Sequence, residues 1–170
     1  MNDYDPKKDL GATIRLLSVI LEKGSGLAKH IDAQSNILIG VDLAIFVFAS
    51  SRFTAAPDAF FAALSLFAAL SSFLALLAVH PPGFMRKRGQ EESLLYHKRV
   101  TDFASADEYR KAMDGIDGEH DAIVRQFALE TYNLYKYSYL PKRRLYKIAR
   151  NLLLAGIVIG VSVRIAQLLF

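Results

Sequence analysis

One stretch of the sequence limits the fold more than any other, because the 21 residues from Ala59 to Val79 contain no charged side chain. An α-helix of this length, rising about 1.5 Å per residue, spans the hydrocarbon core of a bilayer, about 30 Å. The 52% content of hydrophobic residues is concentrated in such blocks instead of recurring at helical or strand period. The sequence therefore predicts a membrane-spanning helix from Ala59 to Val79.

Two further apolar blocks approach the length of a span. The first runs from Asn36 to about Ser51 and contains Asp42, and the other, Leu152 to Phe170, is interrupted by Arg164. About seven residues, including Pro57, separate the first block from the span described above, which favours an antiparallel hairpin. We predict an all-α integral membrane protein with a two-span hairpin, a cytosolic helical region and a third, C-terminal span.

The positions of positive charge predict the orientation. Lys and Arg number 5 before the hairpin, 1 in its turn and 14 between His80 and Arg150. Basic residues beside spans stay in the cytosol, so we expect a cytosolic N-terminus. Within the N-terminal helix, Gly24 and Gly26 mark a weak point. The predicted segments are an amphipathic cytosolic helix (1–35), the hairpin (36–79), the cytosolic helical region (80–150) and the third span (151–170).

Local signals place two helices in the cytosolic region. Ser105 and Glu108 have the spacing of a capping box and predict a short helix through Ala112. A second helix is expected from Asp121 to Pro141. The proline ring removes one backbone hydrogen bond, so it bends or ends this helix before the third span.

The sequence offers no local motif for catalysis or for metal binding. Cysteine is absent, there is no glycine-rich phosphate loop, and the four histidines lie far apart: His30, His80, His97 and His120. The net charge of +4 fits cytosolic loops beside a membrane at least as well as it fits nucleic acid. We therefore expect no catalytic residues, no metal, no cofactor and no nucleic-acid partner.

Charged residues inside the spans are more informative. Asp42 and Arg164 each cost several kcal/mol at membrane depth unless they are paired, hydrated or able to snorkel. From the cytosolic span ends, Asp42 lies about 10 Å deep and Arg164 about 20 Å deep, so a direct pair requires the long arginine to reach. The alternatives are that Asp42 is an ordinary polar residue near the inner interface and that Arg164 snorkels outward.

Small residues suggest where helices approach closely. Gly156 and Gly160 form a GxxxG step, and Arg164 follows on the same face. The second span has a comparable small face: Ser65, Ala69 and Ser72. Two interpretations are open: a homo-oligomer in which Asp42 or Arg164 lines a polar path, or packing of three helices within one subunit.

An aromatic and basic face precedes the third span. Its residues are Tyr132, Tyr135, Tyr139 and Tyr146, with Lys136, Arg143, Arg144 and Lys147 close by. Aromatic rings stack on nucleobases and basic groups hold phosphates, so a nucleotide is one possible ligand. Tyrosines at a membrane interface and lysines at lipid headgroups explain the same pattern.

From about residue 28 to 165 the chain resembles the transmembrane effectors of Pycsar antiphage systems. The matching pieces are Asp32-Ala33-Gln34-Ser35, the tight two-span hairpin, Pro81-Pro82, Phe103-Ala104-Ser105 with Glu108-Tyr109, and Lys136-Tyr137-Ser138-Tyr139-Leu140. The chain departs from the usual pattern at Gln34, where lysine is common, and at Ser35, where alanine is common.

The resemblance implies an effector in the bacterial inner membrane that answers cyclic CMP or cyclic UMP from a partner pyrimidine nucleotide cyclase. It implies that the effector impairs the membrane and causes abortive infection. Asp32, Lys136 and Tyr137 match recurring family positions. With Tyr139, Arg143 and Arg144 they are the candidate nucleotide contacts. The alternatives are a membrane effector of a cyclic-oligonucleotide (CBASS-like) system and a structural membrane protein without a ligand.

Overall fold

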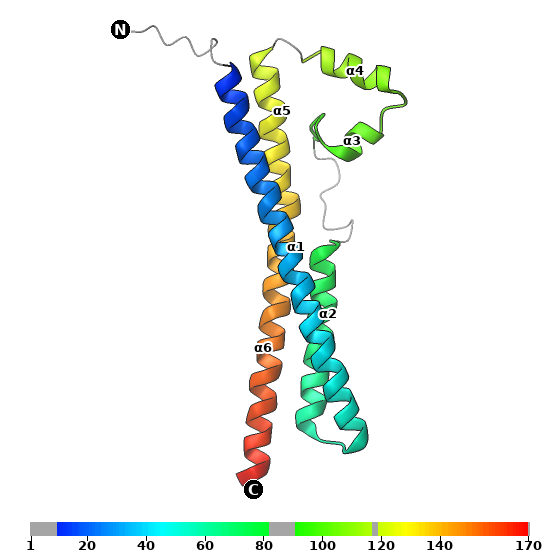
Figure 1. Cartoon of the computed structure of the whole chain (residues 1–170), viewed down its shortest axis with the longest axis vertical. Coiled ribbons are helices and arrows are strands. Elements are labelled where there is room, and N and C mark those ends of the chain that lie inside the picture. The colour runs from blue at the N-terminus through cyan, green and yellow to red at the C-terminus, as the bar shows by residue number, and fades with distance from the viewer. Residues whose placement is uncertain (1–9, 82–90, 117–118, 170) are drawn as a thin grey trace, which may run out of the picture. The chain divides into compact units, whose positions relative to one another are not determined.

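The structure, a computed structural model, describes residues 10–81, 91–116 and 119–169, and every regular element in them is helical. The predicted all-α class is therefore confirmed for these residues. The elements are α1 (Leu10–Ala55), α2 (Ala59–Val79), α3 (His97–Thr101), α4 (Ala106–Asp114), α5 (His120–Asn133), the π-helix η2 (Leu134–Tyr139) and α6 (Leu140–Leu169). Figure 1 shows their order along the chain.

The helices belong to two compact units. The first unit contains α1 up to Leu27 together with α3, α4, α5 and η2, and the second unit contains α1 from Ala28 together with α2 and α6. Three helical runs are long and apolar enough to cross a membrane: Gly11–Ala55, Ala59–Val79 and His120–Leu169. The first two spans predicted from the sequence lie within the first two runs. The third lies within the last run up to Leu169, and its final residue, Phe170, lies outside the described residues.

α1 is longer than the sequence suggested, because it continues through the predicted weak point. Residues 24 to 26 are helical, contrary to the expected weak point. The same helix continues past residue 35, where the boundary between the cytosolic segment and the hairpin stays a prediction. A Cβ atom added at Gly24 would lie 2.8 Å from Cδ2 of Leu134 and 3.0 Å from Cε2 of Tyr135. Gly24 is therefore the point at which η2 approaches α1, and packing overrides the low helix propensity of glycine.

Local hydrogen bonds explain where α2 and α4 begin. Asp58 caps α2 by accepting a bond of 2.8 Å from the N–H of Phe60. Ser105 caps α4 by accepting from the N–H of Glu108, whose carboxylate accepts in turn from the N–H of Ala104. The predicted capping box is confirmed, and the helix it starts runs two residues beyond the expected end.

The approach to Pro141 differs from a simple kink. The helix that begins at His120 changes to π-helical hydrogen bonding over Leu134–Tyr139, and α6 then starts at Leu140. Proline offers no N–H to the preceding turn, so the break in the α-helical ladder spreads over the six residues before it. The third span is thus the continuation of a helix that starts well before residue 151.

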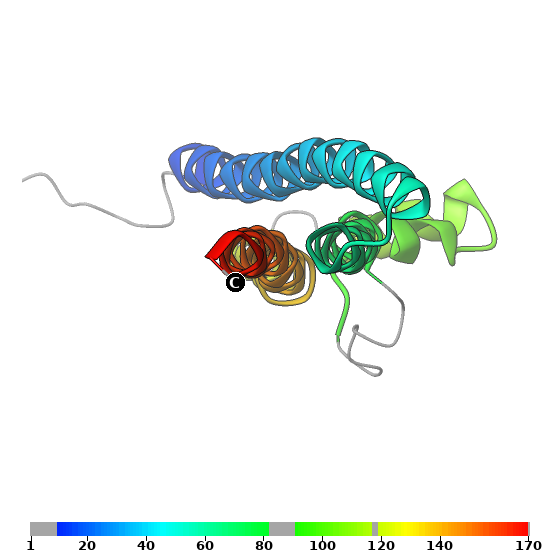
Figure 2. The same cartoon turned by 90° about the horizontal axis from the view of Figure 1, so that it is seen from below.

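In the second unit α1 and α2 run antiparallel, and both pack against α6. Contacts at Ser50 with Ser65 and at Asp42 with Ser71 fix the antiparallel register of α1 and α2. Figure 2, which looks along the helices, shows α2 and α6 next to each other. The core of the second unit contains Leu38, Ala68, Ala75, Ala149 and Leu153.

Candidate functional site

Burial in the second unit is reversed relative to a water-soluble bundle. Large apolar side chains face outward, such as Ile37 at 69% exposure and Val158 at 64%, whereas Ser35, Asp42 and Ser71 are fully buried. Lipid provides no hydrophobic force that drives apolar helices together, so membrane bundles are held by small residues and polar contacts. This arrangement is the one expected of helices surrounded by hydrocarbon.

Asp42 is central to this polar interior. Its Oδ2 lies 2.7 Å from Oγ of Ser71 on α2, and the same Oγ lies 2.9 Å from the carbonyl oxygen of Ala149 on α6. One serine hydroxyl therefore connects all three helices of the second unit. The sequence indicated Asp42 but not Ser71 or Ala149, which lie 29 and 78 residues from their partners.

Arg164 does not pair with Asp42. Its Nη1 lies 3.1 Å from Oδ2 of Asp58, and Nε2 of Gln167 donates to the other carboxylate oxygen of Asp58 at 3.2 Å. Asp58 is thus an α2 cap and an anchor for the end of α6 at once. The pKa of its carboxyl is held below the ordinary value, first by the N–H of Phe60 and then by Gln167 and Arg164.

The two glycines of the GxxxG step contact α2 of the same chain. A Cβ atom at Gly156 would overlap the Cβ of Phe67, and one at Gly160 would lie 3.1 Å from Cδ2 of Phe60. In the small face predicted for α2, Ala69 is exposed, whereas Ser65 and Ser72 are half-buried and Ser65 bonds to Ser50 on α1. The fully buried positions of α2 are Ala68, Ser71, Ala75 and Ala78. Gly156 and Gly160 therefore serve packing within the subunit, and a role in oligomers stays a prediction.

Asp32, a candidate nucleotide contact, has a partner within the second unit. Nζ of Lys142 lies 2.7 and 2.8 Å from its two carboxylate oxygens. The side chain of Asp32 is only 31% exposed and that of Lys142 only 14%. This partly buried pair joins α1 to α6. Lys142 was missed by the sequence reasoning, and no local spacing signals a contact across 110 residues.

The tyrosines before α6 separate into two groups. The ammonium group of Lys136 lies over the ring of Tyr132 at 4.7 Å and near that of Tyr137 at 5.9 Å, and it donates to the Tyr132 hydroxyl. Tyr135 instead pairs edge to face with Tyr139. The candidate contacts Lys136, Tyr137 and Tyr139 thus belong to η2 in the first unit, whereas Arg143 and Arg144 are exposed residues of α6.

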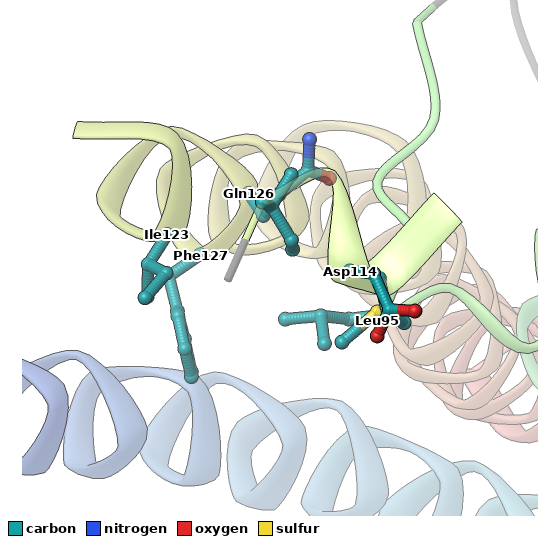
Figure 3. A pocket seen from close by; sticks show the side chains of 7 residues that line it. Leu95, Asp114, Ile123, Gln126 and Phe127 are labelled. Carbon is teal, nitrogen blue, oxygen red and sulfur yellow. The ribbon is translucent and has the colours of Figure 1, made fainter. Parts of the chain in front are cut away.

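The first unit holds its irregular segment against α5 through side-chain bonds. The N–H of Leu94 donates to Gln126 at 2.9 Å, Arg125 pairs with Glu91 at 2.9 Å, and Ser93 donates to Glu130. These bonds position a pocket of about 350 Å³, shown in Figure 3. Its lining is Leu95, Met113, Asp114, Ile116, Ile123, Gln126 and Phe127.

This pocket was not foreseen from the sequence. Its walls are mainly apolar, and Ile123 and Phe127 project from α5 toward α1 in Figure 3. Its one charged lining residue, Asp114, is exposed and pairs with Arg110 on the same helix. The size suits a small ligand, but the lining provides a carboxylate where an anionic ligand requires a cation.

A model of one protein family matches nearly the whole chain. The family is described as Pycsar effector protein domain, and the match covers residues 16–168. The chain belongs to the Pycsar effector family. The resemblance inferred from the sequence motifs is confirmed, and with three helices able to span a bilayer this Pycsar effector is a membrane protein. No curated protein and no solved structure matches the chain.

The match includes residues of both units. It begins within α1 and ends within α6 of this Pycsar effector. The matched range includes four groups of contacts described above, those around Asp42, Asp58, Asp32 and Lys136. None of these clusters has a cysteine, and no group of three His, Asp or Glu residues in the described part of the chain is placed to hold a metal.

Proposed function

We propose that this chain is an antiviral defence effector that responds to cyclic CMP or cyclic UMP from a partner cyclase and impairs the bacterial inner membrane. The observation that carries the proposal is the family match over residues 16–168. Loss of membrane integrity then causes abortive infection. The N-terminus lies in the cytosol, α1 and α2 cross the membrane as a hairpin, and α6 supplies the third span.

The structure supports a division of labour between the units. The second unit has an apolar exterior and a polar interior, as a membrane bundle requires. The first unit carries a basic and aromatic group in which Lys136 and Tyr132 are exposed and Tyr137 is half-buried. α1 contributes to both units, so a ligand that favours one packing of the first unit acts on a helix that continues into the second.

The candidate nucleotide contacts are those inferred above: Asp32, Lys136, Tyr137, Tyr139, Arg143 and Arg144. A cyclic nucleotide offers one phosphate charge and one flat base, which match an ammonium group and tyrosine rings. Asp32 already has a cation, so its contribution to binding would be to hold Lys142 and α6 in place.

The decisive experiment uses the purified full chain in liposomes loaded with a self-quenched dye. Cyclic CMP or cyclic UMP should increase dye release and oligomer size, whereas linear CMP and cyclic AMP should not. Lys136→Gln should weaken the response, and Lys98→Gln on α3 is the matched control. Release with a cyclic oligonucleotide alone favours the CBASS-like alternative, and assembly that ignores every nucleotide favours a structural protein.

A further inference from the structure

Asp42 is the most deeply enclosed ionisable side chain that the described residues contain. It is 0% exposed and lies within the part of α1 that faces α2 and α6. The core residues around it are small or apolar, including Leu38, Ala75 and Ala149. A carboxyl group at this place must be neutral, paired with a cation or surrounded by donors.

The hydrogen atoms available to this group can be counted. Three oxygens form a chain, from Oδ2 of Asp42 through Oγ of Ser71 to the carbonyl of Ala149, with separations of 2.7 and 2.9 Å. Both are lengths of complete hydrogen bonds. A carbonyl oxygen only accepts, and a serine hydroxyl has one proton to donate. If Ser71 donates to Ala149, the proton of the first bond must come from Asp42.

The second carboxyl oxygen gives an independent indication. Oδ1 of Asp42 is buried and has no hydrogen-bond partner in the described part of the chain. In a carboxylate this atom would carry about half of a negative charge with no donor, at a cost of several kcal/mol. In a neutral acid it is an uncharged carbonyl oxygen, which costs far less to leave unpaired.

The elements packed against Asp42 provide no compensating cation. α2 contains no charged residue between Ala59 and Val79, and its contribution is Ser71. On α6, Tyr146 is the titratable member of the surrounding cluster, and Lys142 is bound to Asp32. The other basic residues of this part of α6 are exposed: Arg143, Arg144, Lys147 and Arg150. No cation in the described residues pairs with Asp42.

We infer that Asp42 is a proton-binding site, protonated in the packed bundle and donating to Ser71, which donates to the carbonyl of Ala149. When the three helices separate, the O–H bond of the acid breaks, the proton passes to water and the carboxylate becomes hydrated. The bound proton is inferred from the contacts of Asp42. Release of this proton rests on the proposed function, in which the bundle opens, and proton release makes opening easier as the pH rises.

Infrared spectroscopy of the full chain in lipid vesicles at neutral pH tests the bound proton. We expect the carbonyl stretch of a protonated carboxylic acid in the wild type, its loss in Asp42→Asn and a frequency shift in Ser71→Ala. Asparagine keeps a donor toward Ser71, so this variant should retain its helical circular dichroism. Asp107→Asn, which removes an exposed carboxylate of α4, is the matched control and should leave the band unchanged. Absence of the band, or its survival in Asp42→Asn, overturns the assignment.

Dye release against pH tests the coupling to opening. With cyclic nucleotide present, release by the wild type should rise with pH, at most about tenfold per pH unit for one proton. Asp42→Asn should release less dye and show no slope. A flat wild-type profile, or an equal slope in the variant, overturns the coupling. If nucleotide triggers no release at all, the proposed function fails, and the infrared band still decides the proton site.

Discussion

Lys142 of α6 and Asp32 of α1 form a two-pronged ion pair across 110 residues, with Nζ 2.7 and 2.8 Å from the two carboxylate oxygens. The pair is mostly shielded from solvent, and its members come from two helices of the second unit. Such a pair contributes more than an exposed one, because removing either partner leaves a poorly hydrated charge.

Removal of one partner should therefore lower stability. We expect Lys142→Gln or Asp32→Asn to reduce the free energy of unfolding by about 1 to 3 kcal/mol, between the effects typical of exposed and buried pairs. The double variant should lose less than the sum of the two. Arg110→Gln, which breaks pairs that are more than half exposed, is the control and should cost below about 1 kcal/mol. Thermal unfolding in detergent measures the stability of all four variants. Strictly additive losses in the double variant would show that Lys142 and Asp32 do not interact.

The contact between Gly156 and Phe67 predicts a difference between two glycines. Gly156→Ala should destabilise the chain by about 1 to 3 kcal/mol, since the new methyl group meets the Cβ of Phe67, which cannot rotate away. Gly40→Ala is the matched variant, because nothing lies within 4 Å of the added Cβ, and it should be neutral or slightly stabilising. Chemical unfolding in mixed micelles compares the pair, and equal effects would contradict the packing of α2 on α6.

The same reasoning applies to α1 and η2 in the first unit. Gly24→Leu should lower the unfolding temperature and expose α5 to protease, because the side chain would occupy the space of Leu134 and Tyr135. Gly26→Leu places the same side chain two residues away, where nothing lies within 4 Å. Limited proteolysis of the full chain should distinguish the two variants. Similar digestion rates would show that η2 does not approach α1 at Gly24.

Acid should weaken the anchor at Asp58. The pKa of this carboxyl lies below its ordinary value in the folded chain, so the ionised form stabilises the fold. The contribution is complete above the ordinary aspartate pKa, about 3.9, and is lost as the pH falls through the lower folded pKa. Asp58→Asn keeps a capping acceptor but no charge, so its unfolding temperature should fall less on acidification. Parallel acid profiles for the two proteins would refute this role.

Local features of the fold were predictable, because their causes lie within a few residues. The cap from Ser105 to Glu108, the uncharged run of α2 and the disturbance before Pro141 all follow from neighbouring side chains and backbone groups. The π-helical form of that disturbance was not predictable, since the missing N–H of Pro141 shows only that an α-helical bond is lost.

The partners inside the bundle were not predictable. Alanine and serine recur throughout α2, so its sequence gives no period that distinguishes the face at Ser71 from that at Ser72. The choice depends on where Asp42 and Ala149 lie, and both are distant in sequence. For the same reason Arg164 was noted as a residue of interest, while Asp58, 106 residues away, was not paired with it.

The reversed burial of the second unit affects how the bundle resists water. The core of a water-soluble protein excludes water because its side chains are apolar, and a water molecule that enters it loses hydrogen-bond partners. Here the helices are held together by hydrogen bonds, which water can also form. They lie between Asp42 and Ser71 and between Ser50 and Ser65. A water molecule that enters can replace a hydrogen bond that it breaks. Entry of water at one level of the bundle therefore makes its entry at the next level easier.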